Sequence, residues 1–171
     1  DDGIQFINQT PLANLTSRVT ETWFGSGPIV ANAKVMVPLK AQEDRTTEVD
    51  VSVQLQGNEL VMPNYQLDVH DFTTELTYSN DKGLSALSYA PKLLGGPVSG
   101  NIESDVRGNR GEIRVVAAGE VSVPRLHRWS RQPIFTHVNG ELAYASTLHV
   151  PFGTGAMPPY VVVESDLIGV A

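Results

Sequence analysis

The stretch Val49-Asp50-Val51-Ser52-Val53-Gln54-Leu55 decides how this chain folds. Apolar and polar side chains alternate along it, and a period of two places the apolar ones on one face of a β-strand. Residues 29–37 have the same period, with one apolar side formed by Ile29, Ala31, Ala33, Val35 and Val37. Both stretches therefore predict half-buried strands.

Similar stretches continue along the chain at a spacing of about ten residues, which is typical of all-β folds. We expect further strands at 59–69, 72–79, 84–90, 97–106, 111–121, 140–150 and 161–169. The turns that separate strands are predicted at Gly57-Asn58, Asn80-Asp81, Gly95-Gly96 and Gly108-Asn109. The pattern predicts a mainly β protein with one continuous antiparallel meander over residues 1–171.

Two short helices interrupt this pattern. Thr10 and Pro11 form a helix start, and the apolar residues that follow at spacings of three and four end at Trp23, so we expect a helix at 11–23. The second helix is predicted at 123–131, where Pro124 opens the pattern and Trp129 lies near its end. We expect both tryptophans to anchor their helices against the sheet.

Part of the sequence is repeated with weak similarity. Residues 27–39 return as 140–152, and Val49, Val51 and Leu55 match Val161, Val163 and Leu167. We interpret the chain as about one and a half units of about 112 residues, with copies near 11–57 and 124–169. Arrays of repeated β units present long surfaces rather than one pocket, which favours binding or transport over catalysis.

Composition excludes several classes of function. The net charge of −7 argues against a nucleic-acid partner, since phosphate binding needs a basic face. The densest positive stretch is Arg125 to Arg131. The absence of cysteine excludes disulfides, thiolate metal sites and a cysteine nucleophile. No apolar run is long enough to span a bilayer, and we expect the chain to be a piece of a larger protein.

Candidate chemistry is sparse. In Asp68-Val69-His70-Asp71, a strand puts Asp68 and His70 on one face and Asp71 on the other, with too few ligands for zinc. Residues 96–100 lack the spacing of a nucleophile elbow, and residues 108–111 are a hairpin turn rather than a phosphate loop. We therefore predict no catalytic residue, no metal and no cofactor. A carbohydrate-active β-barrel, which would need paired carboxylates in a cleft, is the third alternative.

Six segments together resemble the YhdP members of the AsmA-like family. They occur in the family's order and cover nearly the whole chain: 8–12, 27–39, 82–86, 93–98, 119–129 and 164–171. The resemblance implies a periplasmic segment of a large protein that is anchored in the inner membrane of Gram-negative bacteria. It also implies an open, twisted β-groove through which phospholipid passes toward the outer membrane without enzymatic chemistry.

Two interpretations of the apolar faces remain open. They either pack into a dry core, as in a β-sandwich adhesion or scaffold module, or they line an open groove filled by acyl chains. The resemblance favours the groove, with lipid contacts at Val35, Val37, Val49, Val51, Val53, Leu55, Val161, Val163 and Leu167. The implied partners are phospholipid acyl chains, the rest of the parent chain at both ends, and proteins of the two membranes.

Overall fold

The computed structural model describes residues 22–39 and 47–168, and the helix expected at 11–23 lies outside them except for its last two residues. Ten strands form one antiparallel sheet. They are β1 (Phe24–Ser26), β2 (Ile29–Met36), β3 (Glu48–Met62), β4 (Leu67–Ser79), β5 (Gly83–Tyr89), β6 (Lys92–Leu93), β7 (Gly96–Arg107), β8 (Arg110–Ser122), β9 (Glu141–Phe152) and β10 (Tyr160–Glu164). The prediction of a mainly β meander is confirmed.

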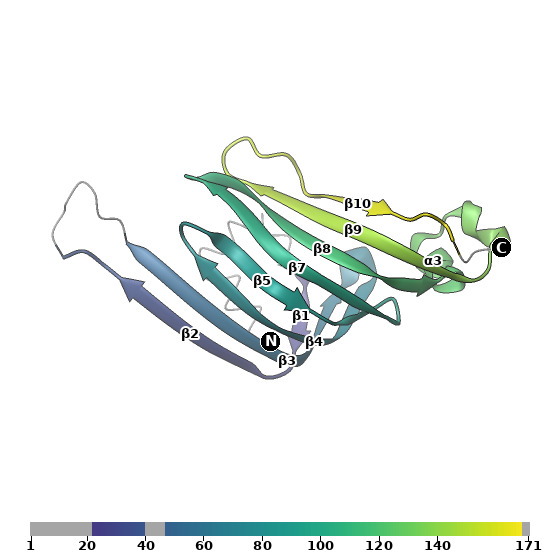
Figure 1. The fold of residues 1–171 in the computed structure, drawn as a ribbon, viewed down its shortest axis with the longest axis horizontal. Coiled ribbons are helices and arrows are strands. Elements are labelled where there is room, and N and C mark those ends of the chain that lie inside the picture. Colours follow the sequence, from purple (N-terminus) through teal and green to yellow (C-terminus); the bar gives the residue numbers. More distant parts are fainter. Residues whose placement is uncertain (1–21, 40–46, 169–171) are drawn as a thin grey trace.

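The strands follow one another in space almost as they do in the sequence. The main order is β1-β3-β4-β5-β7-β8-β9-β10, with β2 beside β3 and the short β6 between β4 and β7. Figure 1 shows this succession from β2 at one side of the molecule to β10 at the other. Each pairing is antiparallel. Short turns join β4 to β5 and β7 to β8, whereas residues 123–140 connect β8 to β9.

The predicted turn at Gly57-Asn58 is wrong, because β3 runs through this point to Met62. Gly57 has a φ of 67° and forms a bulge, in which one extra residue shifts the register between Leu55 and Asn58. A second bulge at Asp71, with a φ of 55°, restores the register on β4. The real turn is the 3-10 helix η2 (Pro63–Tyr65), which begins at a proline.

These two bulges preserve one apolar face. On β3 that face passes from odd-numbered residues up to Leu55 to even-numbered ones from Asn58, and on β4 it changes in the same way between Val69 and Phe72. Without a bulge on each strand, a strict period of two would turn the apolar side chains outward after Leu55. The single strand predicted at 59–69 is wrong, because η2 divides these residues between β3 and β4, whereas the strand predicted at 72–79 is part of the longer β4.

The middle of the sheet is curved enough to bury its apolar face. Its buried residues belong to β5, β7, β8 and β9: Ala86, Tyr89, Val98, Ile113, Val121, Leu142 and Phe152. This curvature gives the sheet a small, barrel-like interior where the sequence predicted an open groove. The apolar residues of the outermost strands are far more exposed, as Val35 on β2 and Val163 on β10 show at 58% each.

Glycine permits the closest approach between two of the central strands. A Cβ on Gly100 of β7 would lie 1.8 Å from the Val116 carbonyl oxygen and 2.7 Å from the Tyr89 hydroxyl oxygen. The Tyr89 ring covers this glycine and meets Phe72 edge to face, with 5.7 Å between the ring centroids. An aromatic ring over a strand glycine replaces the packing that the missing side chain would supply.

The second predicted helix is confirmed as α3 (Val123–Ser130), which is followed by the 3-10 helix η3 (Pro133–His137). Val123 is only 1% exposed and fixes the start of α3 against the sheet. The Trp129 indole nitrogen donates a hydrogen bond to the Tyr65 carbonyl, 2.8 Å away on η2. Trp129 thus holds α3 to the turn between β3 and β4, at the ends of the strands (Figure 1).

Candidate functional site

One apolar face runs across the whole sheet, and the strand register defines it. Residues directly opposite each other on neighbouring strands point to the same face. Val51 lies between Ala33 and Tyr78, and Tyr78 is opposite Leu84. On the other half of the sheet the face continues through Ala86, Ile102, Val115, Leu148 and Val161. We call this surface the apolar face.

The structure brings most of the predicted contact residues onto this surface. The apolar face includes Val35, Val49, Val51, Val53, Leu55, Val161 and Val163. Val37 follows the end of β2, and Leu167 lies beyond β10 with a φ of 58°. The strand predicted at 161–169 is therefore shorter than expected, because it ends at Glu164, and Leu167 does not continue its alternation.

The two halves of the predicted repeat have corresponding registers. In the β2–β3 hairpin Ala33 is opposite Val51, and Val35 is opposite Val49. In the β9–β10 hairpin the residues that the repeat equates with them, Ser146 with Val163 and Leu148 with Val161, are opposite each other too. The two hairpins therefore present the same positions to the apolar face.

Several hydroxyl groups on the apolar face are directed into the backbone. Each donates a hydrogen bond to a carbonyl oxygen, at 2.6 Å from Thr74 to Ser88, 2.7 Å from Ser104 to Leu84 and 3.4 Å from Ser146 to Ala117. When a side-chain hydroxyl is hydrogen bonded to the backbone, mainly the carbon atoms of that side chain remain to contact a ligand. A ligand on the apolar face would therefore meet fewer free polar groups than the residue composition of that face suggests.

Two tyrosines, Tyr89 on β5 and Tyr144 on β9, belong to this face. Tyr89 donates a short hydrogen bond to the Val116 carbonyl, whereas the buried Tyr144 hydroxyl has no hydrogen-bond partner among the described residues. Burial, together with the charge of an ionised Tyr144, raises the pKa of Tyr89 to about 12. Burial also raises the pKa of Tyr144. Both phenols are held in their neutral form.

Replacing Tyr89 with phenylalanine should lower stability at neutral pH by about 1 kcal/mol, the net value of one hydrogen bond. The raised pKa of Tyr89 also makes stability fall with alkali, because the folded state holds this proton more tightly than the unfolded state. The stabilisation is complete below pH 10, the ordinary tyrosine value, and is lost as the pH rises towards 12. Urea midpoints measured across this range should fall less steeply in Tyr89→Phe.

Tyr160→Phe is the matched control for this experiment, because Tyr160 is an exposed residue that stacks on His149 with 4.5 Å between the ring centroids. It should leave both the neutral stability and the alkaline slope near those of the wild type. An alkaline slope in Tyr89→Phe as steep as in the wild type would contradict the assignment, because the contribution of Tyr89 should be gone while those of Tyr144 and Lys92 remain.

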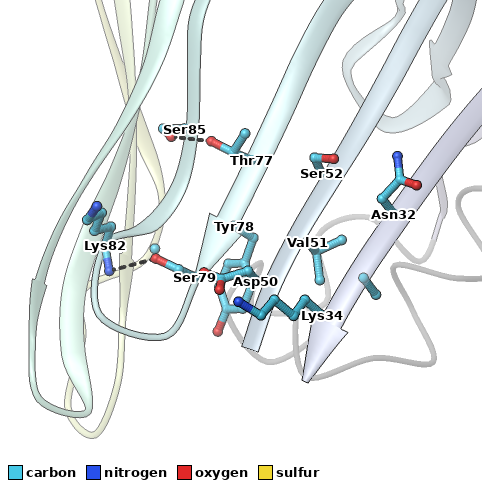
Figure 2. A pocket seen from close by; sticks show the side chains of 12 residues that line it. Asn32, Lys34, Asp50, Val51, Ser52, Thr77, Tyr78, Ser79, Lys82 and Ser85 are labelled. Carbon is cyan, nitrogen blue, oxygen red and sulfur yellow. Dashed lines mark hydrogen bonds between the residues drawn. The ribbon is translucent and has the colours of Figure 1, made fainter. Parts of the chain in front are cut away.

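The opposite face of the sheet is polar. Figure 2 shows a hollow on β2 to β5 where hydroxyl, amide and charged side chains gather, among them Asn32, Lys34, Asp50, Ser52 and Lys82. Thr77 and Ser85 are hydrogen bonded there at 2.8 Å. Further along, Arg114 pairs with Glu103 at 3.1 Å. The charged side chains of the sheet thus gather on this face, although Val30, Val116 and Val162 also lie on it.

Sequence reasoning missed the central part of the apolar face. Ile102, Ile113, Val115 and Leu148 all belong to strands that were predicted, but none was assigned to the site. Their alternation marked them as one face of each strand, whereas only the register shows that these faces join those of β3 and β10.

Chemistry-bearing residues remain scattered. In residues 22–39 and 47–168 no three histidine or carboxylate side chains lie close enough to hold a metal ion. Asp68 and His70 are exposed, as the sequence predicted for a polar strand face, and His70 lies 3.4 Å from Glu59. No helix in this part of the chain is long and apolar enough to cross a membrane.

The comparison with protein families agrees with this geometry. The family model described as YhdP protein matches residues 1–171, which is the full sequence. The chain belongs to the YhdP family. This family is placed in the AsmA-like group and points to lipid transport rather than to an enzyme. No curated protein and no solved structure matched this YhdP-family chain.

Proposed function

We propose that this chain is a segment of a periplasmic groove that carries phospholipid between the inner and outer membranes of Gram-negative bacteria. In this proposal the acyl chains lie on the apolar face, and the groove is open where the margins of that face are exposed. The observation that supports it best is the continuity of the face from Val35 on β2 to Val163 on β10.

The exposure of the apolar face at its margins, which are formed by β2 and β10, also supports the proposal. Ile29, Val35, Val161 and Val163 all belong to the apolar face, yet each is exposed by 42–58%. Exposed apolar surfaces larger than a few hundred Å² usually mark binding sites in soluble proteins. The polar opposite face keeps such a segment soluble while the apolar face receives lipid.

The uniformity of the face suits transport without chemistry. Burying one methylene group is worth about 0.8 kcal/mol wherever it contacts an apolar surface. A chain that slides along an unbroken apolar surface therefore keeps a nearly constant free energy. We also propose that the corresponding β2–β3 and β9–β10 hairpins belong to successive repeat units, so that the parent chain extends the face at both ends.

Photo-crosslinking tests the proposed function. A photoreactive residue at position 51 or 163 should form adducts with phospholipid, because both positions lie on the apolar face. The matched control is position 54, since Gln54 is an exposed residue on the opposite face of β3. Native mass spectrometry of the purified protein should detect co-purified phospholipid.

The β-sandwich alternative predicts a different result. The burial of Ile113 and Phe152 favours a dry core in the middle of the sheet, and a purely structural module would need nothing more. A folded protein that gives no lipid adduct at position 51 or 163, or equal adducts at position 54, would contradict lipid transport and favour that module.

A further inference from the structure

The segment from α3 to η3 is the most basic part of an acidic protein. It contains Arg125, His127, Arg128, Arg131 and His137, and no aspartate or glutamate occurs between Val121 and Gly140. The whole chain has 19 acidic residues and a net charge of −7, so this concentration of positive charge is local.

These three arginines are exposed and carry no ion pair within the described residues. Two arginines elsewhere are paired, since Arg107 lies 2.6 Å from Asp105 and Arg114 lies 3.1 Å from Glu103, whereas Arg110 has no ion pair among the described residues. Glu120 and Glu141 line a shallow hollow together with Arg125, but neither lies within 4.0 Å of its guanidinium nitrogens. The positive charge of the segment is thus available to an external anion.

The fold holds this segment at one rim of the apolar face. The Arg125 side chain donates a hydrogen bond to the Leu94 carbonyl, 3.2 Å away in the turn before β7. Trp129 holds the other end of α3 to the turn after β3. Val98, Val121 and Leu142, which belong to the apolar face, are buried at this end of the strands. The segment therefore lies at the ends of these strands, where Arg125 adjoins Val121 of the apolar face and also Glu120 and Glu141 of the polar face.

Guanidinium groups bind phosphate with charge-assisted, often bidentate hydrogen bonds. Arg125 and Arg128 are three positions apart on a helix, so they are neighbours on its surface and repel each other unless an anion lies between them. We propose that Arg125, Arg128 and Arg131 bind the phosphate of a phospholipid headgroup while its acyl chains lie on the apolar face. This inference rests on the proposed function and names the group that the rim recognises.

Binding measurements with two lipids of identical acyl chains test the proposal. The probes are a fluorescent phosphatidylglycerol and the matching fluorescent diacylglycerol, which lacks the phosphate. The wild type should bind the phospholipid about tenfold more tightly, the effect of one or two charge-assisted hydrogen bonds. The triple variant Arg125→Gln, Arg128→Gln, Arg131→Gln should lose this preference and keep its affinity for diacylglycerol.

The matched control is Arg110→Gln, because Arg110 is another exposed arginine without an ion pair and it lies at the other end of β8. It should retain the preference for the phospholipid. Equal affinity of the wild type for the two lipids would overturn the proposal. An equal loss of affinity for both lipids in the triple variant would overturn it as well.

Two further outcomes separate the sources of failure. Binding of glycerol 3-phosphate as tightly as the phospholipid would show a site for soluble phosphates and overturn the lipid assignment. Failure of the wild type to bind either lipid would overturn the proposed function together with this inference, whereas diacylglycerol binding without a phospholipid preference overturns this inference alone.

Discussion

Replacing Gly100 with alanine is expected to destabilise the protein by at least about 3 kcal/mol, at the upper end of overpacking effects. The new methyl group would lie 1.8 Å from the Val116 carbonyl oxygen on β8, and it would also meet the Tyr89 ring. Backbone cannot move aside as a flexible side chain can, so β7 and β8 would have to separate. Urea unfolding followed by circular dichroism measures the loss.

Gly57→Ala is the control, because a Cβ there meets nothing within 4 Å although φ is 67°. It should cost only the strain of a left-handed residue, about 1–2 kcal/mol. If Gly100→Ala proved no more destabilising than Gly57→Ala, the close approach of β7 and β8 would not be what requires glycine at position 100.

The second large effect is expected from Ile113→Asp, which places a charge on the apolar face where Ile113 is only 5% exposed. An unpaired buried carboxylate should cost more than about 4 kcal/mol and leave much of the protein unfolded at 37 °C. Val163→Asp changes the same face, but Val163 is 58% exposed. Its cost should stay within about 1 kcal/mol, the span of strand propensities.

The two aspartate variants should therefore affect different properties, stability in Ile113→Asp and lipid binding in Val163→Asp. Val163→Asp should remain folded and lose lipid adducts from a photoreactive residue at position 51, because acyl chains that cover the new carboxylate would remove it from water. A thermal unfolding curve checks the first expectation, and crosslinking checks the second. Unfolding of Val163→Asp to the same extent as Ile113→Asp would mean that the margins are core rather than groove.

The alternation of side chains was sufficient to predict most strands and the helix at α3. Val49 to Leu55 alternates without a break, and the turns at Asn80-Asp81 and Gly108-Asn109 lie where the structure has them. A period of two records which residues share a face of one strand, and this information is local. The predicted contact residues on β2, β3 and β10 followed from it.

Features that depend on the relation between strands could not be predicted in this way. Gly57 followed by Asn58 is a typical turn sequence, and only the pairing with Phe72 shows that it is a bulge. The curvature that buries Ile113 but exposes Val163 arises from the sheet as a whole. Likewise, nothing local to Trp129 indicates a hydrogen bond to Tyr65, 64 residues earlier in the chain.

The paired bulges at Gly57 and Asp71 have a consequence for how this sheet can change length during evolution. Loss of Gly57 alone would turn Leu60 and Met62 outward, while Leu67 and Val69 opposite them stayed inward. Loss of one residue near Asp71 as well would realign the two strands but send all four side chains to the polar face. A deletion at one bulge therefore disrupts the apolar face even when a second deletion on the other strand restores the pairing.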